Sequence, residues 1–281
     1  MPRIMSLARV SLLLVAFALL ATRTQAGPIF LTGHDPDFHS AVGSPGAQNL
    51  LTAGLQFVTG NTYNSGTKFL WVESFLAPTG GHVVGEGGLT AIGLTLGTHY
   101  DWVNAAGFAG ANLNNYDAIA IASSFGGMLT QDELDALIAR TADITSYING
   151  GGGLLALSEC FPASGNCLAD TLGPAPALFG YLPVAVTSVD TTAPYGLTPA
   201  GALMFPTLTD ADMNDPTHNS FGLVGGLTII DTDAAGVATT LAGNVTIDDG
   251  GFNPIPEPGS LILLGSGVLA FAARSYRRRR V

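Results

Sequence analysis

Two histidines and an aspartate that could share one metal ion follow the first apolar segment of the chain. His34, Asp37 and His39 are close enough in sequence to place two imidazoles and a carboxylate around the same ion. Imidazole suits zinc or iron, whereas carboxylate oxygen suits harder ions. Because the spacing matches no established metal-binding motif, the alternative is a polar loop in which Asp35 or Asp37 caps a turn around Pro36.

Further polar side chains come directly after other apolar segments. Glu73 follows the segment Phe69 to Val72, and Glu159 follows Leu154 to Leu157. If these segments are parallel strands, their carboxyl ends meet at one edge of the sheet, where ligands bind in open α/β folds. An enzyme on this chain would therefore take its catalytic residues from one set: His34, Asp37, His39, Glu73 and Glu159.

A second candidate metal site lies in an acidic segment later in the chain. Asp210, Asp212 and Asn214 place oxygen atoms at alternate positions, as the start of a calcium-binding loop does. The glycine expected at the sixth position of such a loop is Asp215, and the glutamate expected at the twelfth is missing. Calcium is therefore the cofactor suggested for this segment, and a solvated turn rich in Asp and Asn is the alternative.

The two cysteines lie close together in a segment rich in turn-forming residues. Cys160 and Cys167 flank Phe-Pro-Ala-Ser-Gly-Asn, so a local disulfide is expected if the chain reaches an oxidising compartment. The alternative is that Cys160 is a nucleophile, although no histidine lies near it in the sequence to activate it.

The elements that would position these side chains alternate between strands and helices. Short apolar segments predict strands at Ile29–Gly33, Phe69–Val72, His99–Val103, Ala118–Ala122 and Leu154–Leu157. Amphipathic spacing predicts helices at Gln48–Val58, Leu89–Leu96 and Thr130–Ile148, the last beginning with a capping box formed by Thr130 and Glu133. This alternation indicates a three-layer, doubly wound, mostly parallel α/β sheet with helices on both faces.

The cationic residues are concentrated at the two ends of the chain. Of its ten Lys and Arg residues, Lys68 and Arg140 alone fall within residues 27–253, where twenty of the 21 acidic residues lie. This central body therefore carries a net charge of about −18 at neutral pH. Because phosphate binding depends on Lys and Arg, the composition excludes a nucleic-acid partner.

The first 26 residues have the layout of a secretory signal peptide. Arg3 and Arg9 precede an apolar stretch from Val10 to Leu20, and Thr24-Gln25-Ala26 offers a cleavage site with small residues. We therefore expect a signal helix at 1–26, cleavage after Ala26 by signal peptidase, and one exported α/β domain at 27–253.

Residues 254–281 form a three-part tail. Pro256-Glu257-Pro258 precedes an apolar segment at 259–273, and the basic end at 274–281 holds Arg274, Arg277, Arg278, Arg279 and Arg280. As a helix the apolar segment would be about 22 Å long, shorter than the ~30 Å hydrocarbon core of a bilayer. Such a short transmembrane helix, with a basic end retained in the cytoplasm, suits a transient anchor. An ordinary single-span anchor is the alternative.

This tail resembles the PEP-CTERM sorting signal that exosortase-type systems of Gram-negative bacteria recognise. The resemblance implies export across the inner membrane, transient anchoring there, and processing by an exosortase-type enzyme. The expected destination is the cell surface or the extracellular space, where extracellular polysaccharide is a candidate partner.

The body resembles the class I glutamine amidotransferase-like superfamily, including its ThuA-like members. The similarity is carried by Asn115 to Ile121 and by Tyr147 to Leu157, with weaker support from Pro216 to Asn219 and from a late hairpin at Thr228 to Leu241. It implies a flavodoxin- or amidotransferase-like sheet. The Gly-x-Cys-x-Gly elbow of the catalytic members is replaced by Ser158-Glu159-Cys160, and no His-x-Glu pair follows.

These observations predict an exported cell-surface or extracellular-matrix protein without a catalytic site. Two alternatives remain at this stage. One is a divergent ThuA-like hydrolase or carbohydrate-active enzyme that uses the strand-end residues, and the other is an adhesion module stabilised by calcium.

Overall fold

The computed structural model describes most of the predicted exported body. It describes residues 26–60, 63, 67–77, 84–124, 126–158, 179–184, 186, 188–215, 218–222, 225–248 and 251–254. The predicted signal peptide, Glu159, both cysteines and the tail beyond Pro254 lie outside these ranges. Within the ranges, no helix is both long and apolar enough to cross a membrane. The predicted C-terminal span at 259–273 is not among the described residues.

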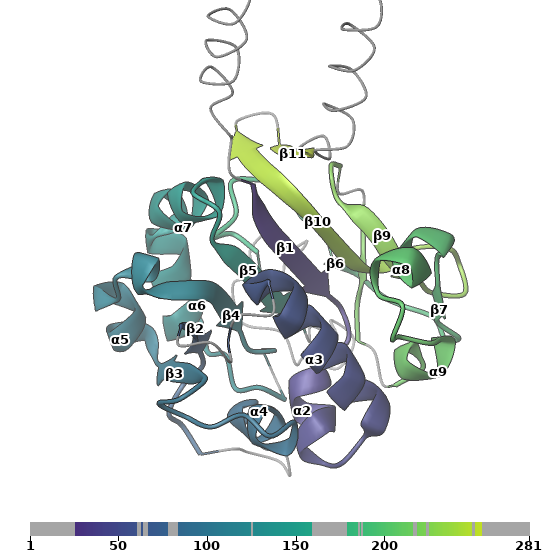
Figure 1. Ribbon diagram of the computed structural model, residues 1–281, viewed down its shortest axis with the longest axis horizontal. Helices are drawn as coiled ribbons and strands as arrows, with labels where there is room; N and C mark the ends of the chain where they lie inside the picture. Colours follow the sequence, from purple (N-terminus) through teal and green to yellow (C-terminus); the bar gives the residue numbers. More distant parts are fainter. Residues whose placement is uncertain are drawn as a thin grey trace, which may run out of the picture.

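The described residues form a mixed α/β fold around one large sheet (Figure 1). The strands are β1 (Gly27–Thr32), β2 (Lys68–Val72), β3 (Tyr100–Val103), β4 (Tyr116–Ile121), β5 (Gly153–Leu157), β6 (Ser188–Val189), β7 (Gly196–Leu197), β8 (Ser220–Phe221), β9 (Thr228–Thr232), β10 (Ala238–Asp248) and β11 (Gly251–Pro254). The helices are α2 (Pro36–Ala41), α3 (Pro45–Thr59), α4 (Glu86–Ala91), α5 (Ala105–Gly110), α6 (Gln131–Ala139), α7 (Thr141–Asn149), α8 (Pro199–Met204) and α9 (Asp210–Met213), with a 3₁₀ turn at Leu113–Asn115.

The sheet has a parallel half and an antiparallel half that meet at β1. Its main path runs β3-β2-β4-β5-β1-β10-β8-β6. Neighbours from β3 to β1 are parallel, whereas β10 is antiparallel to β1, β8, β9 and β11. The predicted parallel α/β sheet is therefore confirmed for β1 to β5, and the later strands extend it with antiparallel pairs such as the β9–β10 hairpin.

Helices pack against the parallel half in two groups. In one group α2 contacts both α3 and α4, and α3 packs on β1, β4 and β5; in the other α5 contacts α6, and α7 packs on β10 and β1. The chain moves along the sheet in one direction from β1 to β3 and in the other from β3 to β5. Right-handed crossovers therefore place the two groups on opposite faces, with α3 in front of the sheet in Figure 1.

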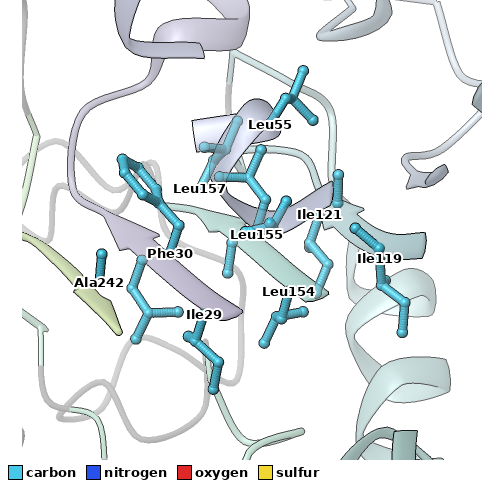
Figure 2. Close-up of a cluster of buried hydrophobic side chains, with 14 of the residues drawn as sticks. Ile29, Phe30, Leu55, Ile119, Ile121, Leu154, Leu155, Leu157 and Ala242 are labelled. Atoms are coloured by element: carbon cyan, nitrogen blue, oxygen red, sulfur yellow. The ribbon is translucent and has the colours of Figure 1, made fainter. Parts of the chain in front are cut away.

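The core lies where α3 meets the central strands. All five residues of β5 are buried, as expected for a parallel strand that is covered on both faces. Figure 2 shows Phe30 of β1 and Leu155 of β5 in this apolar cluster. A Cβ added to Gly54 of α3 would lie 3.1 Å from Leu155 and 3.3 Å from Phe30, so the helix packs very closely on the sheet.

Two predicted helices differ from those observed. The helix predicted at Thr130–Ile148 is two helices, because Arg140 leaves helical geometry with φ −111° and ψ 20°. Its guanidinium Nη1 donates to the carbonyl oxygens of Phe108 and Ala111, so contacts distant in sequence hold the break. The helix predicted at Leu89–Leu96 ends earlier, and Gly93 follows it with a left-handed φ of 84°. The predicted capping box of Thr130 is present.

The close packing of α3 on the sheet predicts a stability loss at the start of β5. A Cβ at Gly153 would lie 2.0 Å from the carbonyl oxygen of Val58 in α3, so Gly153→Ala should lower the free energy of unfolding by about 1–3 kcal/mol. Gly110→Ala is the matched control, because no atom lies within 4 Å of its added Cβ and alanine favours the helix by up to ~1 kcal/mol. Urea denaturation of both variants measures the difference; equal stabilities would contradict the packing argument.

Candidate functional site

Buried polar residues gather at the edge of the sheet where the parallel strands end. The residues that follow β1, β2, β4 and β5 include His34, Asp35, Asp37, Glu73, Ser123, Ser124 and Ser158, all buried. Polar groups are rarely buried unless they are paired, so each of these side chains has to be accounted for by its partners. The edge is therefore the candidate functional site.

The segment that was expected to be either a metal-binding or a capping loop is a helix, α2. Asp35 occupies its N-cap position and Pro36 its first turn, where the fixed φ of proline suits a helix. Residues four apart share one face of a helix. Asp35 Oδ1 therefore lies 3.3 Å from His39 Nε2, and the predicted grouping of His34, Asp37 and His39 around one ion is not formed.

His34 pairs with a different carboxylate. Its Nε2 lies 3.1 Å from Asp231 Oδ2, and its ring packs edge-on against Tyr195 at 5.5 Å between centroids. Burial opposes ionisation of Asp231, but the charge and hydrogen bond of His34, together with the hydroxyls of Thr239 and Thr240, hold the pKa of Asp231 below its usual value. His34 thus joins the parallel half of the sheet to strand β9.

Asp37 is enclosed by glycine backbone. Its Oδ2 accepts a hydrogen bond from the backbone N–H of Ser123 at 2.9 Å, which joins α2 to the end of β4. A Cβ at Gly127 would lie 2.1 Å from the same oxygen, and a Cβ at Gly88 would lie 2.3 Å from the Asp37 carbonyl oxygen. Burial raises the pKa of Asp37 to about 6, against the opposing effect of its backbone donors.

Glu73 is the second carboxylic acid held in a closed environment. Its side chain accepts hydrogen bonds from Trp71 Nε1 at 2.7 Å, from the backbone N–H of Glu86 at 3.0 Å and from the backbone N–H of Gly85. Burial raises the pKa of Glu73 to about 8; the charge of Asp37 adds to this shift and the three donors oppose it. A carboxylic acid that keeps its proton near neutral pH has the property required of a general acid.

His218 completes a group of three that the sequence did not single out. Its Nε2 lies 3.3 Å from Asp35 Oδ1, so both His39 and His218 face the same buried oxygen. Burial disfavours the Asp35 charge, yet the side chains of His218 and His39 hold the pKa of Asp35 below its usual value. The backbone N–H groups of His218 and Asn219 both donate to the carbonyl oxygen of Gly33, which fixes this segment over the end of β1.

Signals in the sequence could have found part of this group. Asp35 before Pro36 is an N-cap followed by a proline, which indicates a helix start and hence a pairing of Asp35 with His39. No local pattern connects either residue to His218, which entered the sequence argument only through the amidotransferase-like similarity of Pro216 to Asn219.

The predicted calcium ligands lie in and just after α9. Asp212 accepts hydrogen bonds from Asn49 Nδ2 and from the backbone N–H of Thr209, and Asp210 accepts one from the backbone N–H of Leu197. Asn214 Oδ1 accepts a hydrogen bond from the Tyr195 N–H, and Asn214 Nδ2 donates one to the Tyr195 carbonyl oxygen. A calcium ion would have to displace these bonds, so the structure does not favour the site, and calcium stays a prediction.

The other predicted functional residues lie outside the described part of the chain. They are Glu159, the cysteines Cys160 and Cys167, the motif Pro256-Glu257-Pro258, and the basic residues Arg274, Arg277, Arg278, Arg279 and Arg280. Their roles as catalytic, disulfide or sorting residues stay predictions from the sequence.

Comparison with known proteins identifies the tail. Residues 254–279 match the model of the PEP-CTERM protein-sorting motif. The motif indicates export and processing by an exosortase at the membrane of a Gram-negative bacterium. No curated protein and no solved structure matches the chain. The amidotransferase-like resemblance of the body therefore has no support from a match and remains a prediction.

The buried Glu73 predicts a pH dependence of stability. Its pKa is raised from 4.5 to about 8 in the folded protein, so its contribution to stability is fully present below about pH 4.5 and is lost by about pH 8. Between pH 6 and 8, above the pKa of Asp37, this loss amounts to at most ~1.4 kcal/mol per pH unit. Glu73→Gln cannot titrate, so its free energy of unfolding should fall less steeply over this range.

Urea denaturation of the full chain in mild detergent at several pH values measures these slopes. Asp132→Asn, which removes a carboxylate from an exposed position in the first turn of α6, is the matched control. The quantity compared is the slope of the free energy of unfolding against pH. If this slope is the same for Glu73→Gln, for Asp132→Asn and for the unsubstituted chain, Glu73 is not held protonated.

Proposed function

We propose that this chain is an exported protein that its PEP-CTERM tail delivers to the cell surface or the extracellular matrix, where its body acts without catalysis. The match of residues 254–279 to the sorting motif carries the proposal. The charge of about −18 on residues 27–253 supports it, because a strongly acidic body stays soluble and is repelled by anionic membrane surfaces.

The positions at which the chain enters and leaves the sheet support surface display. Gly27 of β1 pairs with Val245 of β10, and Val245 pairs with Pro254 of β11, so these three residues form one row across neighbouring strands. Strands lie about 4.8 Å apart, which places Gly27 and Pro254 roughly 10 Å from each other. The predicted signal-peptide cleavage site and the sorting motif thus adjoin the same end of the body, seen at the end of β10 nearest β11 in Figure 1.

The candidate site lies at the opposite end of β1. Thr32 is five residues beyond Gly27, about 17 Å along an extended strand. While both chain ends hold the body at the membrane, this edge would face away from the bilayer. In this proposal signal peptidase cleaves after Ala26, the apolar segment 259–273 holds the chain transiently, and an exosortase-type enzyme recognises Pro256-Glu257-Pro258. The released body then associates with extracellular polysaccharide.

A hydrolase or carbohydrate-active enzyme is the second candidate. The observation that favours it is the pair of buried carboxylic acids, Asp37 and Glu73, whose pKa values burial raises to about 6 and about 8. Two acids with different proton affinities at the carboxyl ends of parallel strands suit general acid–base chemistry.

Replacement of Pro256-Glu257-Pro258 by three alanines tests the sorting proposal. The variant should accumulate in the inner membrane with its tail intact, because the processing enzyme no longer recognises it. Cell fractionation and mass spectrometry of the C-terminal peptide measure this result. Pro206→Ala, at an exposed proline of the body, is the control and should be processed normally. Normal release of the triple-alanine protein would refute the proposal.

A screen for hydrolysis separates the two candidate functions. A non-catalytic body should release no product from glycosides, polysaccharides, carboxyl esters or peptides above the rate without protein. Turnover that disappears in Glu73→Gln and persists in Asp132→Asn would replace the proposal with the hydrolase.

A further inference from the structure

We infer that Asp35, His39 and His218 form a binding site for one divalent transition-metal ion, with Zn²⁺ as the best match. The site is new with respect to the sorting function, which the tail alone supports. Among the described residues, these three make up the group of His, Cys, Asp or Glu whose ligand atoms all lie within 4.8 Å of one another.

The separations between the ligand atoms suit a tetrahedral ion. Asp35 Oδ1 lies 3.3 Å from His39 Nε2 and 3.3 Å from His218 Nε2. Tetrahedral bonds of 2.0–2.1 Å to zinc place neighbouring ligand atoms roughly 3.3–3.4 Å apart. The three atoms are therefore already spaced as they would be around one zinc ion.

The Asp35 carboxylate is buried, and its charge partners are the two histidines. Its side chain is 0% exposed, and neither of its oxygens accepts a hydrogen bond from any described residue. A buried carboxylate is costly unless it is paired, hydrogen-bonded or bound to a metal. A cation held between Asp35 and the two histidines would meet this need directly.

The types of ligand select the class of ion. Two imidazoles with one carboxylate are typical of zinc and of other first-row transition metals. Calcium and magnesium prefer oxygen ligands alone, so they fit this group poorly. The histidines therefore argue for Zn²⁺ over the calcium that the sequence suggested elsewhere.

A second carboxylate, that of Asp215, lies behind His39. His39 Nδ1 lies 3.9 Å from Asp215 Oδ1, on the side of the ring away from Asp35. Asp215 Oδ2 in turn accepts hydrogen bonds from the backbone N–H of Ala47 at 2.9 Å and from Ser44 Oγ. A carboxylate behind a histidine is the usual outer partner of a metal-ligating imidazole, because it fixes the ring and raises its basicity.

The backbone at the end of β1 holds the third ligand in place. The carbonyl oxygen of Gly33 accepts both the His218 N–H at 3.1 Å and the Asn219 N–H at 3.2 Å. A Cβ at Gly33 would lie 1.9 Å from the Asn219 carbonyl oxygen, so glycine permits this contact. Asp35, two residues after Gly33, is thereby kept beside His218.

The site is accessible from solvent on its histidine side. The His39 and His218 side chains are 16% and 27% exposed, whereas Asp35 is fully covered. Three protein ligands leave a fourth position for water or a ligand, as in zinc sites of the catalytic type. A bound metal would therefore strengthen the hydrolase candidate, although the inference itself does not depend on either function.

Zinc titration of the full chain tests the inference. The chain is purified in mild detergent without a histidine tag, stripped with a chelator and titrated with Zn²⁺ against a chromophoric competitor. We expect one equivalent to bind and to raise the thermal midpoint. His39→Ala, His218→Ala and Asp35→Asn should each weaken binding at least 100-fold, and Asp215→Asn should weaken it about 10- to 100-fold.

Two controls make the result decisive. His99→Ala removes a histidine outside the group, one whose Nδ1 accepts the Thr95 N–H, and should bind zinc as the unsubstituted chain does. Glutamine variants of His39 and His218 replace any alanine variant that fails to fold, as judged by circular dichroism. Cobalt(II) in place of zinc should give the strong visible absorption of a tetrahedral site.

Two outcomes would overturn the inference. One is a folded, stripped chain that binds no stoichiometric zinc; the other is zinc binding that survives every ligand variant. Because these measurements use purified protein, their outcome is independent of whether the tail is processed.

Discussion

The arrangement of the molecule depends on the two ladders of hydrogen bonds that β1 makes. On one side β1 pairs in parallel with β5, and on the other it pairs antiparallel with β10. Because Thr32 is aligned at once with Leu157 and with Thr240, the end of β1 brings together the strand ends of the parallel half and the long C-terminal strand. A shift of one residue in either ladder would turn every side chain of β1 to the opposite face.

The same register explains why the end of β1 can hold so many buried polar groups. The residues at the end of β1 and just after it form hydrogen bonds with three distant parts of the chain. These are Ser158 after β5, Asp231 in β9, and the His218–Asn219 segment before β8. Backbone donors and glycine contacts surround Asp37 in α2 and Glu73 after β2, and burial raises the pKa values of both acids. Apolar side chains at these positions would often give equal or greater stability, and the polar edge is therefore where we propose a binding site.

The two ends of β1 lie beside different parts of the chain. At Gly27 the chain enters the body beside β10 and β11, next to the point where the sorting tail begins. At Gly33 it reaches the candidate site. In the proposed function, the end of β1 at Gly27 lies near the cleavage and sorting segments, and the opposite end lies near the proposed ligand site.

The sequence alone determined the features that depend on neighbouring residues. The sorting tail, the alternation of apolar strands with amphipathic helices, and the capping box at Thr130 are all local patterns. The tail matches the sorting motif, strands β1 to β5 form, and the capping box is present. Tertiary structure decided the rest. Arg140 breaks a helix because its guanidinium reaches Phe108 and Ala111, and His218 meets Asp35 because strand pairing carries its segment over the end of β1. Such contacts join residues distant in the chain, and their geometry is set by the register of the sheet, which no short segment of sequence encodes.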